Sequence, residues 1–215
     1  MFLSIKNIPK VSWSSNKSLN FKPKLSTSFY LIFGLAIFGL GEGLLILSTT
    51  GNSPWSVLAE GISLNSSLSI GSATFFVSVA VLFIWIFLKQ KPGLGTIFNI
   101  IIIAGTIDFT LYFFEPPSSF FFKYLLSVIS VILVGLGSGI YLVANLGPGP
   151  RDGLMTGLTK ITNLPIAFVR AFLEISVVLI GWYLGGTVGI GTLIFAFGIG
   201  PCVALGLYLV DKIFD

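Results

Sequence analysis

Two glycine-rich stretches decide the architecture: GLGEGLLILSTTGNSPWSVLAEGIS at residues 39–63 and GLGSGIYLVANLGPGPRDGLMTGLT at residues 135–159. They are related by a shift of 96 residues (135 − 39 = 96), and this register extends without a gap from residues 39–109 onto residues 135–205. Across those 71 positions (109 − 39 + 1 = 71), 18 residues are identical, of which seven are glycines and one is a proline. Because these residue types mark special backbone conformations or close packing, the pattern predicts a structural repeat.

The composition places this repeat in a membrane. Hydrophobic residues make up 54% of the 215 residues, charged residues only 9%, and the mean hydropathy is +0.99. A water-soluble domain would carry about a quarter charged residues. Six apolar runs are each long enough to cross a hydrocarbon core of about 30 Å, and they cover residues 29–48, 68–88, 97–114, 124–144, 165–184 and 190–210. We therefore expect an all-α polytopic membrane protein with six transmembrane helices in one membrane domain, residues 29–215.

Residues 1–28 differ from the rest of the chain, because they contain five lysines and no acidic residue. We expect them to form a disordered basic cytoplasmic tail. Positive charges mark the cytoplasmic side of a membrane protein. With the tail inside, the inner segments hold ten lysines and arginines and the outer segments hold only Lys123. The sequence thus predicts a multi-pass protein of the bacterial cytoplasmic (inner) membrane, with both termini in the cytoplasm.

Each copy of the repeat contains three spans, repeat one at about residues 29–115 and repeat two at about residues 124–211. Since three is an odd number, the second copy must enter the membrane from the opposite side. Two inverted three-helix repeats are typical of transporters and channels, in which the site lies between the repeats. Duplication also occurs in proteins that transport nothing, so the repeat alone does not decide the function.

The loops at residues 49–64 and 145–164 are longer than a turn requires. Each carries a proline, Pro54 or Pro150, that could open a short half-helix of one to two turns, and Ser53 could cap the first. These half-helices would be either re-entrant or flat on the membrane interface. If they are re-entrant, their N-termini could converge and favour anions. The residues that we expect to shape this motif are Pro54, Gly61, Pro150, Gly157 and Gly191.

The second loop also carries a family signature. From GPGPRDGLM at residues 147–155, through Arg170 and Glu174, to the glycine-rich run at residues 181–201, the chain resembles the YczE/YitT-like family of bacterial integral membrane proteins. Pro54-Trp55 and Gly61 resemble the upstream motif of that family, and the resemblance covers about residues 35–210. It implies the fold and an inner-membrane location. It implies no catalytic residue, because the biochemical role of the members is largely unassigned.

Four ionisable residues, Glu42, Asp108, Arg170 and Glu174, lie within the expected spans. Charged groups at this depth are costly and face a partner or a cavity. Arg170 and Glu174 are four residues apart and could neutralise each other. Alternatively, Arg170 could join Arg151 at the Pro150 helix start in an inward-facing anion pocket. The candidate substrate-binding residues are therefore Arg151, Asp152, Arg170, Glu174, Glu42 and Asp108.

The sequence offers little for catalysis. It contains no histidine and one cysteine, so no zinc site and no Ser-His or Cys-His site can be assembled. We expect no enzyme activity, no cofactor, no metal and no nucleic-acid partner. The function that we expect is a small-solute transporter or channel, with an anion as one candidate solute. The alternatives are a substrate-binding membrane subunit that needs an ATPase partner, and a membrane scaffold for a cytoplasmic enzyme. Beside the lipid bilayer, a homo-oligomer or a partner protein stays open.

Overall fold

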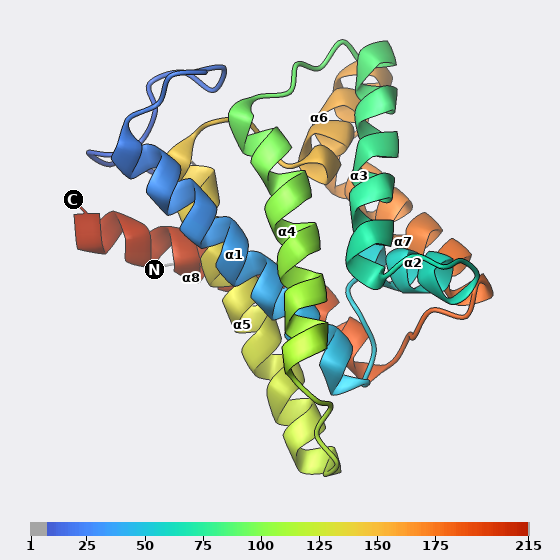
Figure 1. Cartoon of the computed structure of the whole chain (residues 1–215). Coiled ribbons are helices and arrows are strands. Elements are labelled where there is room, and N and C mark those ends of the chain that lie inside the picture. The colour runs from blue at the N-terminus through green and yellow to red at the C-terminus, as the bar shows by residue number, and fades with distance from the viewer. Residues whose placement is uncertain (1–7, 215) are drawn as a thin grey trace.

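The computed structural model describes residues 8–214. This range contains eight α-helices and no strand, so the all-α fold class is confirmed. Six of the helices are long and apolar enough to cross a membrane. The elements, shown in Figure 1, are α1 (Leu25–Ser48), α2 (Pro54–Leu64), α3 (Ile70–Phe87), α4 (Leu94–Phe113), α5 (Phe120–Ala144), α6 (Pro150–Thr162), α7 (Ile166–Tyr183) and α8 (Ile190–Phe214).

The six predicted spans coincide with α1, α3, α4, α5, α7 and α8. The helices α2 and α6 lie in the two long loops, where the sequence predicted half-helices. They are longer than the one to two turns expected, with 11 and 13 residues, which is about three turns each at 3.6 residues per turn. Each begins at its proline, which is tolerated at the first helical position because the N–H there has no partner inside the helix.

The same order of helices occurs twice along the chain. The bounds of α3 and α7 differ by the sequence shift at both ends (166 − 70 = 96; 183 − 87 = 96). The long helices α1 and α5 both end at a left-handed residue, Thr49 with φ 56° and Asn145 with φ 52°. A glycine with positive φ follows in each copy, Gly51 at 122° and Gly147 at 111°. A side chain would be strained at these angles, which explains why the repeat keeps glycine at both positions.

The helices α1 and α5 form the centre of the bundle, with α4 against α1 and α8 against α5. Glycines bring the two central backbones together. A Cβ atom on Gly137 would lie 2.5 Å from the backbone nitrogen of Phe38, and one on Gly41 would lie 2.8 Å from Val134. The glycine-rich run was expected to make such a contact and to place Glu42 inside the bundle. Glu42 is indeed buried, with 1% of its surface exposed.

The short helices connect the two halves of the chain. The helix α2 packs against α3 and α7, and α6 packs against the same two helices. The halves differ most clearly in the contact between their last two helices. In the first half α3 packs along α4, whereas α7 and α8 barely touch each other. The second half is therefore the more open one.

Part of the segment that the sequence predicted to be a disordered tail is packed on the bundle. Trp13 is buried, and its ring stacks on Tyr30 with centroids 4.4 Å apart. The backbone N–H of Ser15 donates a hydrogen bond to the carbonyl of Ala144, and the Asn145 side chain donates to the carbonyl of Ser15. The first bond satisfies the Ala144 carbonyl at the end of α5, which has no partner within the helix, and the second satisfies the carbonyl of Ser15. The expectation was wrong for residues 8–24, and residues 1–7 lie outside the described residues.

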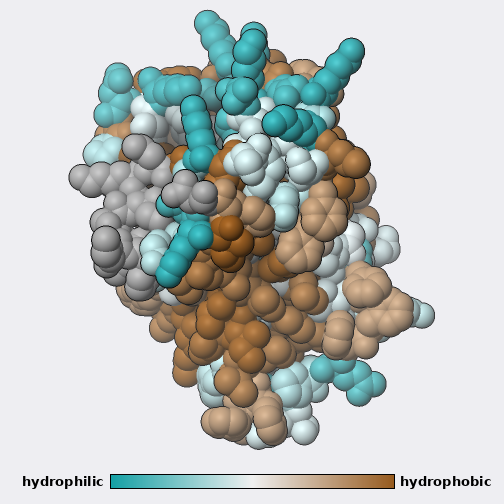
Figure 2. All heavy atoms as spheres, turned by 90° about the vertical axis from the view of Figure 1, so that its left-hand side faces the viewer, coloured by the Kyte–Doolittle hydropathy of each residue, from teal (hydrophilic) through white to brown (hydrophobic). Residues whose placement is uncertain are grey.

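The surface has the polarity of a membrane protein. Figure 2 shows a broad hydrophobic band across the middle of one face, with hydrophilic side chains gathered at the upper end. Large apolar side chains are far more exposed than in water-soluble proteins, for example Phe87 at 81% and Phe197 at 81%. With six apolar helices, such a surface belongs to a multi-pass membrane protein.

Candidate functional site

A cavity of about 250 Å³ lies within the helix bundle, and residues from all eight helices line it. Its wall carries five charged side chains, which are Glu42, Arg151, Asp152, Arg170 and Glu174. The fold thus brings together five of the six residues that the sequence suggested for binding, from helices α1, α6 and α7. Aromatic and aliphatic side chains make up most of the remaining wall.

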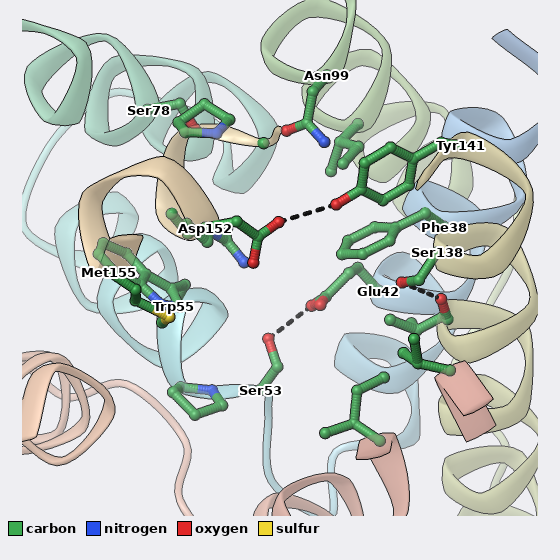
Figure 3. A pocket seen from close by; sticks show the side chains of 18 of the residues that line it. Phe38, Glu42, Ser53, Trp55, Ser78, Asn99, Ser138, Tyr141, Asp152 and Met155 are labelled. Carbon is green, nitrogen blue, oxygen red and sulfur yellow. Dashed lines mark hydrogen bonds between the residues drawn. The ribbon is translucent and has the colours of Figure 1, made fainter. Parts of the chain in front are cut away.

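Glu42 is the most deeply buried of these charges. Its Oε2 atom accepts hydrogen bonds from the hydroxyls of Ser53 and Ser56, each at 2.7 Å. Its Oε1 atom is also buried but has no hydrogen-bond partner among residues 8–214. Figure 3 shows the carboxylate pointing into the cavity. A buried polar atom without a partner costs free energy, so this oxygen is free to accept a further hydrogen bond.

The N-termini of α2 and α6 both reach the cavity, at Pro54 and Pro150. Ser53 occupies the cap position of α2 as expected, but its hydroxyl donates to Glu42 and does not cap the helix. The indole N–H of Trp85 donates to the carbonyl of Pro150 at 2.9 Å and so fixes the start of α6. The first turns of a helix carry free N–H groups and a partial positive charge, which favour an anionic group there.

Arg151 follows Pro150 in the first turn of α6. Its guanidinium carbon lies 5.3 Å from the ring centre of Trp55, a distance at which the cation and the ring attract each other. The side chain of Arg151 takes part in no hydrogen bond or ion pair within residues 8–214. Burial lowers the pKa of the Arg151 guanidinium, while the negative charges of Glu42 and Asp152 act in the opposite direction. Since arginine stays protonated in proteins, the cavity contains a cation with unused hydrogen-bond donors.

Asp152 lies beside Arg151, and it has partners of its own. The hydroxyl of Tyr141 donates a hydrogen bond to Asp152 Oδ2 at 2.9 Å across the cavity (Figure 3). The carboxylate also lies in the first turn of α6, where the helix dipole stabilises a negative charge. Asp152 therefore does not need Arg151 for its stabilisation.

Arg170 and Glu174 form the ion pair that their spacing predicted. The Nε of Arg170 lies 2.8 Å from Oε1 of Glu174, and the two side chains are 49% and 25% exposed. Both lie on α7, the helix that barely touches α8. The pair thus belongs to the accessible part of the wall, where either a neutralising or a binding role fits the geometry.

Asp108 is the candidate that the fold does not bring to the cavity. Its Oδ2 accepts a hydrogen bond from the Ser69 hydroxyl at 2.6 Å, and its Oδ1 accepts one from the N–H of Gly71 at 2.8 Å. These donors lie at the cap and first turn of α3. The carboxylate of Asp108 therefore stabilises the start of a helix outside the cavity.

The glycines of the predicted motif hold the short helices in place. A Cβ atom on Gly61 of α2 would lie 2.6 Å from the carbonyl oxygen of Gly181 on α7. A Cβ atom on Gly157 of α6 would lie 2.9 Å from the side chain of Leu88, next to the end of α3. These glycines let α2 pack closely against α7 and α6 pack closely against the end of α3.

Sequence reasoning missed three residues of the site: Trp55, Ser56 and Tyr141. The repeat register contained a signal for two of them, because Trp55 aligns with Arg151 (151 − 55 = 96) and Ser56 with Asp152 (152 − 56 = 96). A search for the partners of charged residues in the other copy would have found both. Tyr141 aligns with Leu45, which does not line the cavity, so the register gave no indication of it.

Comparison with known proteins places the chain among uncharacterised relatives. A family of unknown function, DUF6198, matches residues 25–207. An uncharacterized protein of Haemophilus influenzae is 41% identical over 209 residues, which cover 97% of this chain and 95% of the relative. The uncharacterized membrane protein YczE of Bacillus subtilis is 30% identical over 174 residues, 80% of each chain. The uncharacterized protein YyaS of the same organism is 30% identical over 171 residues, 77% of this chain and 84% of the relative.

These matches confirm the resemblance to YczE-like proteins that the sequence motifs indicated. No solved structure matches the chain.

Proposed function

The chain belongs to the family of unknown function DUF6198, and we propose that this integral membrane protein transports a small solute. The observation that carries the proposal is the charged cavity between the two halves of the chain. Buried charges are costly in a membrane protein and are retained where they serve a ligand or a pathway. Solute sites of transporters built from inverted repeats lie in the corresponding position. The proposal includes no enzymatic reaction.

The lining of the cavity supports an inverted repeat. Nine pairs of lining residues are related by the shift of 96. They are Phe38 with Val134, Glu42 with Ser138, Ser53 with Gly149, Pro54 with Pro150, Trp55 with Arg151, Thr74 with Arg170, Ser78 with Glu174, Asn99 with Phe195 and Ile103 with Ile199. Equivalent residues of two copies line one space when the axis that relates the copies passes through it. We therefore place the twofold axis through the cavity.

Hydrogen bonds between the halves support the same axis. The N–H of Gly95 in the first half donates to the carbonyl of Leu146 in the second, at 2.7 Å. The equivalent N–H of Gly191 in the second half donates to the carbonyl of Thr50 in the first, at 2.9 Å. Such reciprocal contacts, with donor and acceptor exchanged between the copies, are the signature of a twofold axis. With three spans in each half, that axis would lie in the membrane plane.

The orientation follows from charge. The segment at residues 8–24, the end of α5 and the end of α8 lie together, since Trp13 contacts both Tyr30 and Phe214 and Ser15 binds Ala144. We propose that this side faces the cytoplasm of a bacterial cell and that the membrane is the inner membrane. The lysines of the described tail, the loop between α3 and α4, and the end of α8 all fall on it.

The solute would carry an anionic group. Arg151 offers unused donors in a planar arrangement that fits a carboxylate or a phosphate. It lies in the first turn of α6, where the free N–H groups of the helix add to the positive potential. In this proposal α2 and α6 are re-entrant half-helices, because their N-termini reach a cavity to which all six spanning helices contribute.

The proposal is tested with purified full-length protein. Small carboxylates and phosphates are screened for thermal stabilisation, and each ligand found is then offered to liposomes that contain the protein. We expect saturable uptake of at least one of them. Arg151→Met should weaken binding by about tenfold or more, since it removes a charged hydrogen-bond donor. Lys160→Met removes an exposed cation from the last turn of the same helix and should change nothing.

Two results would redirect the proposal. Stable binding without uptake would favour the substrate-binding subunit that depends on an ATPase partner. A lack of both binding and uptake, together with co-purification of a cytoplasmic enzyme, would favour the membrane scaffold.

A further inference from the structure

We infer that the solute is a small zwitterion, with an ammonium group that faces Glu42 and a carboxylate that faces Arg151. This inference rests on the proposed function and names the class of solute for the same cavity. It differs from a simple anion site in that Glu42 takes part in binding as the partner of a cation. The cavity has an unused acceptor as well as an unused donor, and a zwitterion is the small solute that fits both.

The hydrogen bonds of Glu42 leave one of its two carboxylate oxygens free. Both hydroxyl donors, Ser53 and Ser56, bind the Oε2 atom, so the serines hold the carboxylate in one orientation. The Oε1 atom is left without a partner although the residue is 1% exposed. An ammonium group with three N–H donors could bind this oxygen and would be paired with a buried charge.

Three of the five charged side chains in the cavity wall have partners within the protein. Arg170 and Glu174 neutralise each other at 2.8 Å, and Asp152 has the Tyr141 hydroxyl and the helix start. Glu42 then retains one buried oxygen without a partner, and the side chain of the half-buried Arg151 has neither a hydrogen bond nor an ion pair. Both residues line the same cavity, yet no ion pair within 4.0 Å joins them in the described part of the chain. A solute with a single charge could engage only one of the two groups, whereas a zwitterion engages both.

Further hydrogen-bond donors lie around Arg151. Its guanidinium lies over Trp55, whose buried indole N–H also has no hydrogen-bond partner among residues 8–214. The first turn of α6 adds free backbone N–H groups. The unused donors are therefore those of Arg151, Trp55 and the α6 start, and the unused buried acceptor is Oε1 of Glu42. This polarity matches the two ends of an aminocarboxylate.

The cavity also limits the size of the solute. Its volume of about 250 Å³ lies below the range of about 300–1,000 Å³ that is typical of pockets for drug-sized ligands, so the cavity suits a small solute. Apolar side chains such as Phe38, Ile103 and Ile199 line the wall between the charged groups and would contact a short hydrocarbon chain. A short aminocarboxylate has this composition.

The test uses ligands that differ in one charge. Thermal stabilisation of the purified full-length protein is measured with glycine, β-alanine and 4-aminobutanoate, and with the acid and the amine that match each in length. We expect at least one zwitterion to bind about tenfold or more tightly than its matched acid and its matched amine. That factor is typical of a hydrogen bond to a charged group.

Variants separate the two ends of the solute. Glu42→Gln should weaken binding of the zwitterion by about tenfold to one-hundredfold while leaving the weak binding of the acid unchanged. Arg151→Met should weaken binding of the zwitterion and binding of the acid by similar factors. Glu60→Gln is the matched control, because Glu60 is a hydrogen-bonded carboxylate outside the cavity, with donors Asn52 and Thr187. Glu42→Asp keeps the negative charge. Binding of the zwitterion that persists in this variant would show that the loss in Glu42→Gln is not caused by a failure to fold.

The outcomes are distinct. If an acid binds as tightly as its zwitterion and Glu42→Gln has no effect, the zwitterion is excluded while an anion transporter remains. If an amine alone binds, the assignment of Arg151 is wrong. If neither this panel nor any solute in the uptake screen binds, the inference and the proposed function fail together.

Discussion

At the scale of single residues, the charged side chains of the cavity wall fall into two kinds, and Glu42 alone is fully buried. Asp152, Arg170 and Glu174 have partners within the protein, whereas Glu42 and Arg151 retain unused hydrogen-bonding groups. The first kind is explained by stability alone. The second kind is not, because an unpaired buried polar atom lowers stability. This distinction, and not the number of charges, separates the residues that we assign to the solute from those that support the fold.

The ion pair on α7 gives a test of this distinction. Replacing it as a unit, with Arg170→Met and Glu174→Gln together, should lower the melting temperature by less than about 4 °C, because partly exposed pairs contribute about 0–1 kcal/mol. Ligand binding should also persist. Arg170→Met alone should cost more, since it leaves Glu174 without its cation. Loss of ligand binding in the double variant with the melting temperature preserved would place the pair in the binding site.

At the scale of the elements, the contact between α1 and α5 depends on glycine. Gly137→Ala should destabilise the protein by about 1–3 kcal/mol, because the added methyl group meets the backbone of Phe38. Gly105→Ala in α4 is the control, since a Cβ atom there has no neighbour within 4 Å and alanine favours the helix. Thermal unfolding of the two variants measures the difference. Equal melting temperatures would show that the close contact of α1 and α5 is not needed.

Trp13 is the large buried side chain that holds the segment at residues 8–24 to the bundle, next to the hydrogen bonds of Ser15. Trp13→Ala should release it, so that trypsin cuts after Lys17 much faster while the spanning helices stay intact. Phe21→Ala, at a residue that is 61% exposed, should leave the cleavage rate unchanged. Mass spectrometry of the fragments over time provides the measurement. Slow cleavage in the Trp13 variant would mean that the hydrogen bonds of Ser15 suffice to hold the segment.

The elements were largely predictable from the sequence, because hydropathy and the conserved prolines and glycines of the two copies depend on local chemistry. The six spans and the starts of α2 and α6 follow from these signals. Two features did not. The packing of residues 8–24 depends on one tryptophan in a segment whose composition is typical of disorder. The position of Asp108 at the start of α3 depends on how two helices pack, which periodicity does not reveal.

At the scale of the whole molecule, topology is the property to test first. In a Cys202→Ser background, a cysteine at position 118 should react with an impermeant thiol reagent from outside the cell. A cysteine at position 16 should react only after the membrane is opened. Both residues are exposed, and they lie at opposite ends of the spans. The reverse pattern would overturn the orientation, and reaction of both from the same side would overturn the inverted repeat.

The site was only partly predictable at this scale. The sequence suggested charged residues near α6 and α7, and the fold brings them to one cavity with Glu42. What it did not suggest is that Glu42 keeps an unused oxygen, because that depends on which atom the hydroxyls of Ser53 and Ser56 choose. The class of solute that we infer therefore depends on side-chain geometry, which the sequence does not contain.

The unequal contacts of the two halves have a consequence for the transport that we propose. Where α3 packs along α4, the equivalent pair α7 and α8 barely touch. If the halves are twofold-related, we expect a second state in which they exchange these conformations: α7 closes on α8, and α3 parts from α4. Alternating access would then need no new fold. The two copies would exchange their conformations, and the solute would stay at the twofold axis between them.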